Sequence, residues 1–194
     1  MKKQFLIGYL LAALLFVWSI ISGNYEFLIY AFAVAILVVL LHRTDRVYRF
    51  QAPLLWAFVA WIVMHILGGL WKVGDQVLYS TVLIPLIGEP YSVLKYDQVV
   101  HTYCYFVVAL LMWRVVCHFA RPDAGRTALI VVTVLAASGI GGLNEIVEFA
   151  ATVLVPETNV GGYENTAIDI LANLIGALLA IPFFRRTTGS ETDK

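Results

Sequence analysis

Residues 53–71 read PLLWAFVAWIVMHILGGLW, an apolar run that contains no aspartate, glutamate, lysine or arginine. A helix crosses the hydrocarbon core of a bilayer with about 20 such residues. Pro53 stands at the start of the run, where its missing backbone N–H costs a helix nothing. We therefore predict that this stretch is a membrane-spanning helix.

Comparable apolar runs lie on both sides of this one. We predict six spans, at 4–21, 25–41, 53–71, 98–119, 127–154 and 166–184. No small-x-small cleavage site follows the first run, so we interpret it as a span and not as a signal peptide. Because no linker is long enough to separate two domains, we expect residues 1–194 to form one all-α, polytopic membrane bundle.

The composition agrees with a membrane protein. Of the 194 residues, 61% are hydrophobic and 13% are charged, whereas a soluble domain carries about 25% charged residues. The formal net charge is zero, so no basic surface attracts phosphate backbones. These values exclude a soluble globular enzyme, a disordered chain and a nucleic-acid binder, and they make the lipid bilayer the expected partner.

The basic residues are concentrated on one side of the predicted spans. Eleven of the 13 lie on the side that includes both termini, and only Lys72 and Lys95 lie on the other. Basic residues accumulate on the cytoplasmic side of membrane proteins, so both termini are expected to be cytoplasmic. Nine of the 13 acidic residues lie on the opposite, outer side. Acids contribute little to topology, and their accumulation there therefore indicates a function.

Polar residues inside the spans lie at one depth, near the predicted outer ends. Asp97 and His101 are four residues apart and share one helix face, as do Asp169 and Asn173. Ionisable groups in membrane helices are costly and by default mark a functional site. The set consists of His65, Asp97, His101, Asn144, Glu145, Glu148, Asp169 and Asn173. We expect it to converge into one pocket, covered by the loop 156–165 with Tyr163, Glu164 and Asn165.

Several chemistries fit such a set. A divalent metal ion is one, with His101, Glu145, Glu148 and Asp169 as the expected ligands. Acid/base catalysis between closely spaced carboxylates is a second, and a proton or cation relay is a third. In a fourth interpretation the pairs satisfy one another and only hold the helix register. The expected catalytic residues are Asp97, His101, Glu145, Glu148 and Asp169, and the expected substrate-binding or orienting residues are His65, Asn144, Tyr163, Asn165 and Asn173.

The outer segment 72–97 is too short and too interrupted to hide two further spans. Its apolar part, 77–87, contains Pro85 and is too short to cross a bilayer. It is either an interfacial or re-entrant segment, or a loop whose apolar side packs on the helix ends.

Four stretches carry a family resemblance: HILGG at 65–69, YDQVVH at 96–101, GLNEIVEF at 142–149 and GGYENTAIDILAN at 161–173. Together they resemble the YjdF-like family of bacterial inner-membrane proteins. More distantly, Asp97-x3-His101 and Asp169-x3-Asn173 are similar to the VanZ-like pattern, which is associated with glycopeptide resistance. Here Glu145-x-x-Glu148 stands where that pattern has Glu-x-x-Gln. The resemblance implies a multi-pass protein of the bacterial cytoplasmic membrane and supplies no reaction.

The leading hypothesis is an intramembrane enzyme, metal-dependent or acid/base, that acts on a lipid or lipid-linked envelope substrate from the periplasmic side. The alternatives are a cation- or proton-coupled transporter and a non-catalytic membrane scaffold or accessory protein.

Overall fold

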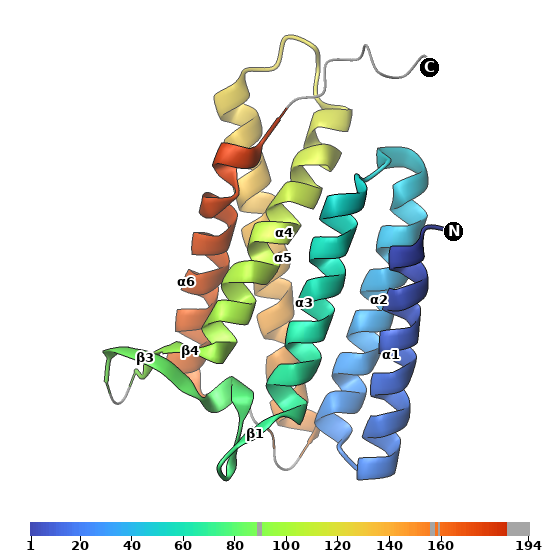
Figure 1. Ribbon diagram of the computed structural model, residues 1–194. Helices are drawn as coiled ribbons and strands as arrows, with labels where there is room; N and C mark the ends of the chain where they lie inside the picture. The colour runs from blue at the N-terminus through green and yellow to red at the C-terminus, as the bar shows by residue number, and fades with distance from the viewer. Residues whose placement is uncertain (89–90, 156–157, 159, 186–194) are drawn as a thin grey trace.

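Six long helices dominate the computed structural model, which describes residues 1–88, 91–155, 158 and 160–185 (Figure 1). They are α1 (Lys3–Ser22), α2 (Tyr25–Tyr48), α3 (Ala52–Leu70), α4 (Tyr96–Phe119), α5 (Arg126–Leu154) and α6 (Tyr163–Leu179), with a short 3-10 helix η2 (Ile181–Phe183) after α6. Each gives a span that is long and apolar enough to cross a membrane, and the sixth span, Tyr163–Phe183, consists of α6 together with η2. The prediction of an all-α polytopic bundle is confirmed. The largest difference in span bounds is that α2 continues to Tyr48, beyond the predicted end at residue 41.

The first two helices form a hairpin around a tight turn. Gly23 has a φ of 66°, in the left-handed region that glycine adopts without a Cβ penalty. The next residue, Asn24, accepts a hydrogen bond through its side chain from the backbone N–H of Phe27 at 3.0 Å. This amide caps α2 at its N-terminus.

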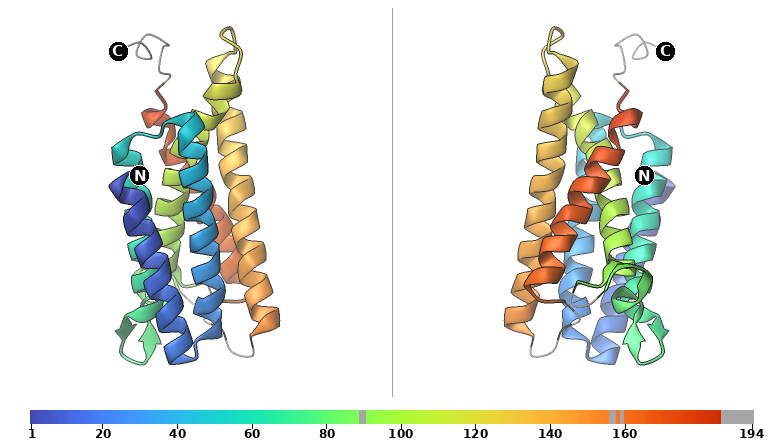
Figure 2. Two further views of the ribbon diagram at one scale, coloured as in Figure 1. Left: turned by 90° about the vertical axis from the view of Figure 1, so that its right-hand side faces the viewer. Right: turned by 90° about the vertical axis from the view of Figure 1, so that its left-hand side faces the viewer.

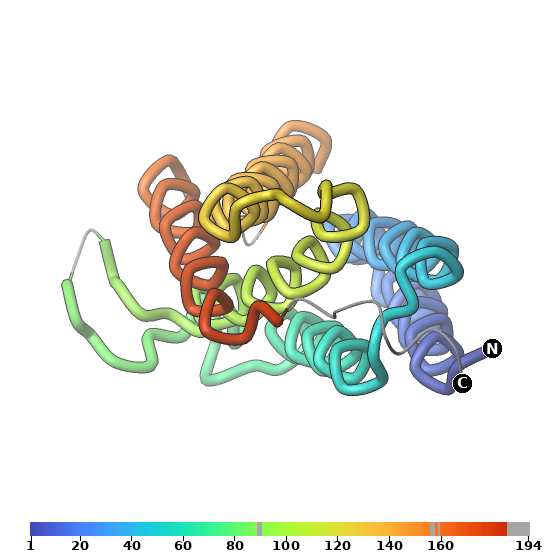
Figure 3. The backbone as a smooth tube through the Cα atoms, turned by 90° about the horizontal axis from the view of Figure 1, so that it is seen from above, coloured from blue at the N-terminus to red at the C-terminus, as the bar shows by residue number. Residues whose placement is uncertain are grey.

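Seen along the bundle axis, the helices form two groups, α1–α3 and α4–α6, with α4 adjoining α3 (Figure 3). One apolar core joins α1, α2, α3 and α4, and it includes Val38, Ile62 and Val107. A second core fills the space between α4, α5 and α6, around Trp113 and Ala137. Helix α4 belongs to both cores and holds the two groups together.

The segment between α3 and α4 forms two short antiparallel ribbons, which the sequence analysis did not predict. The first pairs β1 (Lys72–Val73) with β2 (Gln76–Val77), and the second pairs β3 (Val82–Ile87) with β4 (Val93–Lys95). A 3-10 helix, η1 (Leu78–Ser80), lies between them. All six residues of β3 are exposed, so the predicted packing of 77–87 on the helix ends does not extend to β3, whereas Tyr79 of η1 does pack against the apolar cores of the bundle.

The two ends of the bundle differ in character. The N-terminus and the end of α6 lie together at one end, and β1–β4 lie at the other, which we call the ribbon end (Figures 1 and 2). The ribbon end corresponds to the side predicted to be outer.

Candidate functional site

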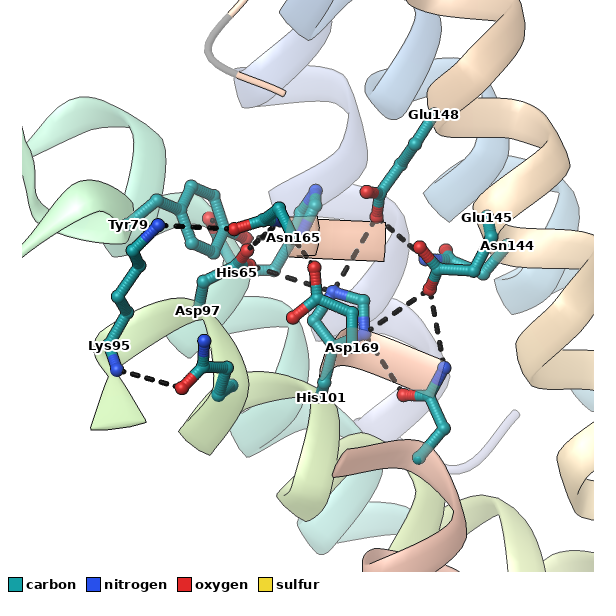
Figure 4. A network of polar contacts seen from close by, with 12 residues as sticks. His65, Tyr79, Lys95, Asp97, His101, Asn144, Glu145, Glu148, Asn165 and Asp169 are labelled. Carbon is teal, nitrogen blue, oxygen red and sulfur yellow. Dashed lines mark hydrogen bonds and ion pairs between the residues drawn. The ribbon is translucent and has the colours of Figure 1, made fainter. Parts of the chain in front are cut away.

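The polar side chains predicted to converge do meet, near the ribbon end (Figure 4). We call them the polar cluster. Helix α3 contributes His65, α4 contributes Asp97 and His101, α5 contributes Asn144, Glu145 and Glu148, and α6 contributes Asn165, Asp169 and Asn173.

His101 lies at the centre of this cluster and is 7% exposed. One edge of its ring faces α6, with Nδ1 3.0 Å from Asn173 Oδ1. The Asn173 amide nitrogen donates to Glu145 Oε1 at 3.3 Å, so the amide oxygen must be the atom that faces the ring. Because that oxygen only accepts, Nδ1 carries the proton and donates.

The other edge of the ring faces two carboxylates. His101 Nε2 is 3.5 Å from Asp97 Oδ1 and 3.5 Å from Glu148 Oε1. With Nδ1 protonated, a neutral ring would direct its Nε2 lone pair at two anions. This repulsion is relieved by a proton, on Nε2 or on one of the two carboxyl groups, or by a bound cation.

Side-chain amides hold the carboxylates in place. The Asn144 amide donates to Glu148 Oε1 at 2.7 Å. The Asn165 amide donates to Asp97 Oδ2 at 3.4 Å and also to Asp169 Oδ2. Lys95 Nζ in turn donates to Asn165 Oδ1 at 3.3 Å. Side-chain amides in such positions are typical of the groups that orient metal ligands or catalytic carboxylates.

Two carboxylate oxygens of the cluster are buried without a hydrogen-bond partner in the described part of the chain. They are Glu145 Oε2 and Asp169 Oδ1, on residues that are 6% and 0% exposed. Leaving such an oxygen without a donor costs about 1–3 kcal/mol, and more when it is charged. Both atoms therefore point to a bound ion or water as the missing partner.

A cavity of about 60 Å³ borders the cluster. A single water needs roughly 10–15 Å³ of such volume, so the cavity has room for an ion with a few waters. It is lined by Glu26, Tyr30, Trp61, His65, Tyr79, Asp97, Val100, His101, Cys104, Tyr105, Asn144, Glu148 and Val160. Glu145 and Asp169 are not among these residues, so the cavity reaches the Asp97, His101 and Glu148 side of the cluster.

His65 enters the cavity from α3 and is oriented by Tyr79 of η1. The Tyr79 hydroxyl lies 3.0 Å from the backbone oxygen of His65, which can only accept, and it also contacts His65 Nδ1. With its single proton directed at the backbone oxygen, the hydroxyl accepts from Nδ1–H. Burial raises the pKa of Tyr79 well above its ordinary value, as do the negative charges of Asp97 and Glu148. The hydroxyl therefore keeps its proton.

This arrangement leaves His65 Nε2 as a lone-pair acceptor. The atom is buried and has no hydrogen-bond partner among the described residues. Gly68 makes the arrangement possible, because a Cβ at that position would lie 2.6 Å from the Tyr79 ring. Gly68 thus admits an aromatic side chain against α3.

Among the residues that the structure describes, two groups have the spacing to hold a metal ion: Asp97, His101 and Asp169, and His101, Glu145 and Glu148. In each, one ligand atom per residue lies within 4.8 Å of the others. Two ligands of a tetrahedral ion, each about 2.1 Å from it, lie about 3.4 Å apart. The 3.5 Å contacts of His101 Nε2 match this spacing and are longer than the roughly 2.7–3.2 Å of an ordinary N–H···O hydrogen bond.

The predicted covering loop is only partly placed. Val160 lines the cavity and Asn165 joins the cluster, whereas residues 156, 157 and 159 lie outside the described residues. Tyr163 is 84% exposed and is absent from the described cavity lining. Its expected orienting role has no contact to support it.

Sequence reasoning missed several residues of the cavity wall. Glu26 is 4% exposed, lies within 3.4 Å of the Tyr30 hydroxyl and lines the cavity. A sequence signal for Glu26 did exist, because it is a single acid in the first turn of a predicted span at its outer end. Tyr79 carried no such signal, because it lies in a segment without helical periodicity.

The Tyr79→Phe variant is expected to lose about 1–3 kcal/mol of stability, because it leaves His65 Nδ1 and its proton buried without an acceptor. Thermal unfolding in mild detergent measures the change. The matched control is Tyr91→Phe, at a side chain that is 50% exposed and is expected to change stability by less than about 0.5 kcal/mol. Equal unfolding temperatures for the two variants would contradict the orienting role of Tyr79.

Comparison with known proteins places most of the chain in one family. Residues 4–189 match the family model described as "Predicted membrane protein (DUF2238)". No curated protein and no solved structure matches the chain. The family description gives a membrane location and names no activity.

Proposed function

This chain belongs to the DUF2238 family of predicted membrane proteins, and we propose that it is a metal-dependent intramembrane enzyme acting on a lipid-linked substrate. The proposal includes a bacterial cytoplasmic membrane, with the ribbon end facing the periplasm. The YjdF-like resemblance is consistent with this family membership, and the more distant VanZ-like resemblance receives no support from the comparisons.

One observation carries the proposal. The Asn173 amide accepts from His101 Nδ1 and so directs Nε2 at the carboxylates of Asp97 and Glu148, both 3.5 Å away. Histidine ligands of metals characteristically donate their second ring N–H to an oxygen acceptor, which fixes the tautomer. A divalent cation at Nε2 would bind the lone pair and compensate the two carboxylates at once.

The residues then take distinct roles. His101 would hold the ion with Asp97 and Asp169, which form one of the two groups with ligand spacing, and with Glu148 of the other group; Asp169 offers an unpartnered oxygen. A divalent ion at such a site lowers the pKa of bound water and polarises a phosphoryl or carbonyl oxygen. Glu145 contacts the protonated edge of the His101 ring, so we give it a positioning role in place of its predicted role as a ligand.

His65 is suited to accept a proton in the same cavity. Its Nε2 is unpartnered among the described residues, and Tyr79 fixes the ring through Nδ1. An imidazole held in one tautomer with a free lone pair has the geometry of a general base. The water or hydroxyl that loses this proton would lie between His65 and His101, both of which line the cavity.

The cavity also supports the class of substrate. Its volume of about 60 Å³ suits a small polar group, not a whole lipid. Three acidic residues, Glu26, Asp97 and Glu148, line it, so a phosphate group would enter only with a metal ion to bind it. A substrate with its reacting group near the membrane surface and its apolar part in lipid fits this location.

A cation- or proton-coupled transporter is the second candidate, and it has less support. Toward the end of the bundle that carries the N-terminus, α4, α5 and α6 enclose an apolar core that includes Ala109, Trp113 and Ala137, each at most 3% exposed. Transport would need a polar path through this half. A scaffold or accessory protein remains the third, and it predicts that Glu148→Gln changes nothing except stability.

The test combines metal content with lipid chemistry. Protein purified in mild detergent is expected to contain stoichiometric divalent metal by elemental analysis, and Glu148→Gln is expected to lose most of it. Mass spectrometry of membrane lipids is then compared between cells that overproduce the wild type and the variant. The proposal expects a lipid-linked species to change only with the wild type.

The control is Glu164→Gln, an exposed acid at the ribbon end, which is expected to behave as the wild type. Protein without bound metal, together with unchanged membrane lipids, would contradict the proposed metal-dependent enzyme. Cation or proton flux in liposomes, abolished by Glu148→Gln, would support the transporter instead.

A further inference from the structure

The ribbon β3–β4 exposes an apolar strand at both of its faces. The side chains of β3 are 40–64% exposed at Val82, Leu83, Ile84, Leu86 and Ile87. Consecutive residues of a strand point to opposite faces. Neither face of β3 is therefore covered by the rest of the described chain, and neither suits water.

The position of the ribbon connects it with the lipid-facing surface of the bundle. It projects sideways beyond α6 and lies level with the start of α6, whereas β1 and β2 continue beyond the end of α3 (Figures 1 and 3). On α6 itself, Ile170 and Leu171 are 50% and 54% exposed and face the lipid in a membrane-spanning helix. The strand continues this apolar surface in the plane of the membrane.

The backbone of β3 indicates how deep the ribbon lies in the membrane. Its register with β4 passes from Val82↔Lys95 to Ile87↔Val93, so residues 83–86 face only Leu94 and the ladder is interrupted between its ends. The other edge of β3 has no strand beside it in the described chain. Open backbone groups are not tolerated in the hydrocarbon core, but the headgroup region satisfies them.

A second copy of the chain is a poor fit for this edge. Pro85 lies in the middle of β3, where it offers no N–H to a neighbouring strand. Proline in an edge strand is one of the devices that prevent edge-to-edge pairing.

We propose that the β3–β4 ribbon is a lipid-binding element that lies in the boundary between headgroups and acyl chains at the ribbon end. Its apolar side chains contact acyl chains, and the open backbone groups of residues 83–86 bind water and headgroups. The proposal is independent of the metal and of catalysis.

The ribbon is joined directly to the polar cluster. Gln98 Oε1 accepts from the backbone N–H of Leu94 at 2.6 Å and of Lys95 at 3.0 Å, which fixes the end of β4 to the first turn of α4. The Lys95 side chain then reaches Asn165 of the polar cluster. Lipid contact at β3 thus holds β4 in place. The side chain of Lys95 in β4 begins the hydrogen-bond chain that leads through Asn165 to Asp97.

Spin labelling in lipid nanodiscs tests the proposal. The label is placed by Ile84→Cys in a chain that also carries Cys104→Ala and Cys117→Ala. The matched control is Asp75→Cys, at an exposed position of the turn between β1 and β2. Collisions with apolar oxygen are compared with collisions with a water-soluble nickel chelate.

The label at position 84 is expected to favour oxygen over nickel by several-fold relative to the label at position 75. Equal preference for nickel at both positions would overturn the proposal. Spin–spin broadening at position 84, removed by dilution with unlabelled chain, would show that a second copy covers the strand and would also overturn it.

A second readout avoids the cysteine substitutions. A photo-crosslinking amino acid replaces Ile84 in the otherwise unchanged chain, and the nanodiscs contain phosphatidylethanolamine and phosphatidylglycerol. Adducts of one chain with phospholipid are expected. Chain–chain adducts, or no lipid adduct where a crosslinker at the lipid-facing Leu171 gives one, would contradict the lipid-binding role.

Discussion

The His101→Ala variant is expected to lose its divalent metal, with affinity reduced beyond the range that titration in detergent measures. His101 is the residue shared by both groups that can hold an ion, and alanine removes the nitrogen ligand while leaving the buried carboxylates to repel one another. Isothermal titration with Zn²⁺ and Mn²⁺ on metal-stripped protein measures the loss.

Two further variants make the result specific. Asn173→Ala removes only the acceptor of His101 Nδ1 and is expected to weaken binding about 10–100-fold, the usual effect of removing a group that orients a ligand. His118→Ala removes an exposed histidine of the same helix and is expected to bind like the wild type. Wild-type affinity in His101→Ala, or equal losses in all three variants, would refute the metal site.

The Gly176→Ala variant is expected to be the most destabilising single-methyl change in the bundle. A Cβ at this position would lie 2.2 Å from the backbone oxygen of Thr102 and 2.9 Å from the backbone nitrogen of Phe106. Backbone atoms of α4 cannot rotate away, so α4 and α6 must separate. Overpacking costs typically 1–3 kcal/mol, and we expect a loss of about 3 kcal/mol in chemical or thermal unfolding.

The separation of α4 from α6 is also expected to disturb the polar cluster. Thr102 follows His101, and Gly176 lies one turn beyond Asn173, so Gly176→Ala is also expected to lengthen the contact between those two side chains and to weaken metal binding. Gly139→Ala is the control, because nothing lies within 4 Å of a Cβ there. Comparable unfolding free energies for the two variants would show that the close approach of α4 and α6 is unimportant.

Much of the candidate site was predictable from local spacing. The separation of Asp97 from His101 and of Asp169 from Asn173 places each pair on one helix face, whatever the partner helices do. The cost of such groups in a membrane made their convergence a reasonable expectation. Which nitrogen of His101 meets which oxygen depends on α5 and α6, since Asn173 and Glu145 lie 72 and 28 residues from their partners in the cluster.

Sequence spacing also could not show which residues line the cavity, because that depends on how separate segments pack. Glu145 and Glu148 are three residues apart, yet only Glu148 lines the cavity, because the rotation of α5 about its axis is set by packing. Tyr79 reaches His65 from η1, a segment whose sequence has no helical period. Tyr163 was assigned to the site by its neighbours in sequence, and its first-turn position on α6 leaves it exposed.

The amino-acid sequence by itself determined the number and class of the helices, because burial of about 20 apolar residues in a bilayer is a property of each segment alone. It also determined which helix faces are polar. Only the tertiary structure decided that His101 presents Nδ1 to Asn173 and Nε2 to two carboxylates, and that β3 projects from the bundle with both faces uncovered. These features depend on how separate helices rotate and pack, and the close approach at Gly176 sets that geometry for the two helices that carry His101 and Asn173.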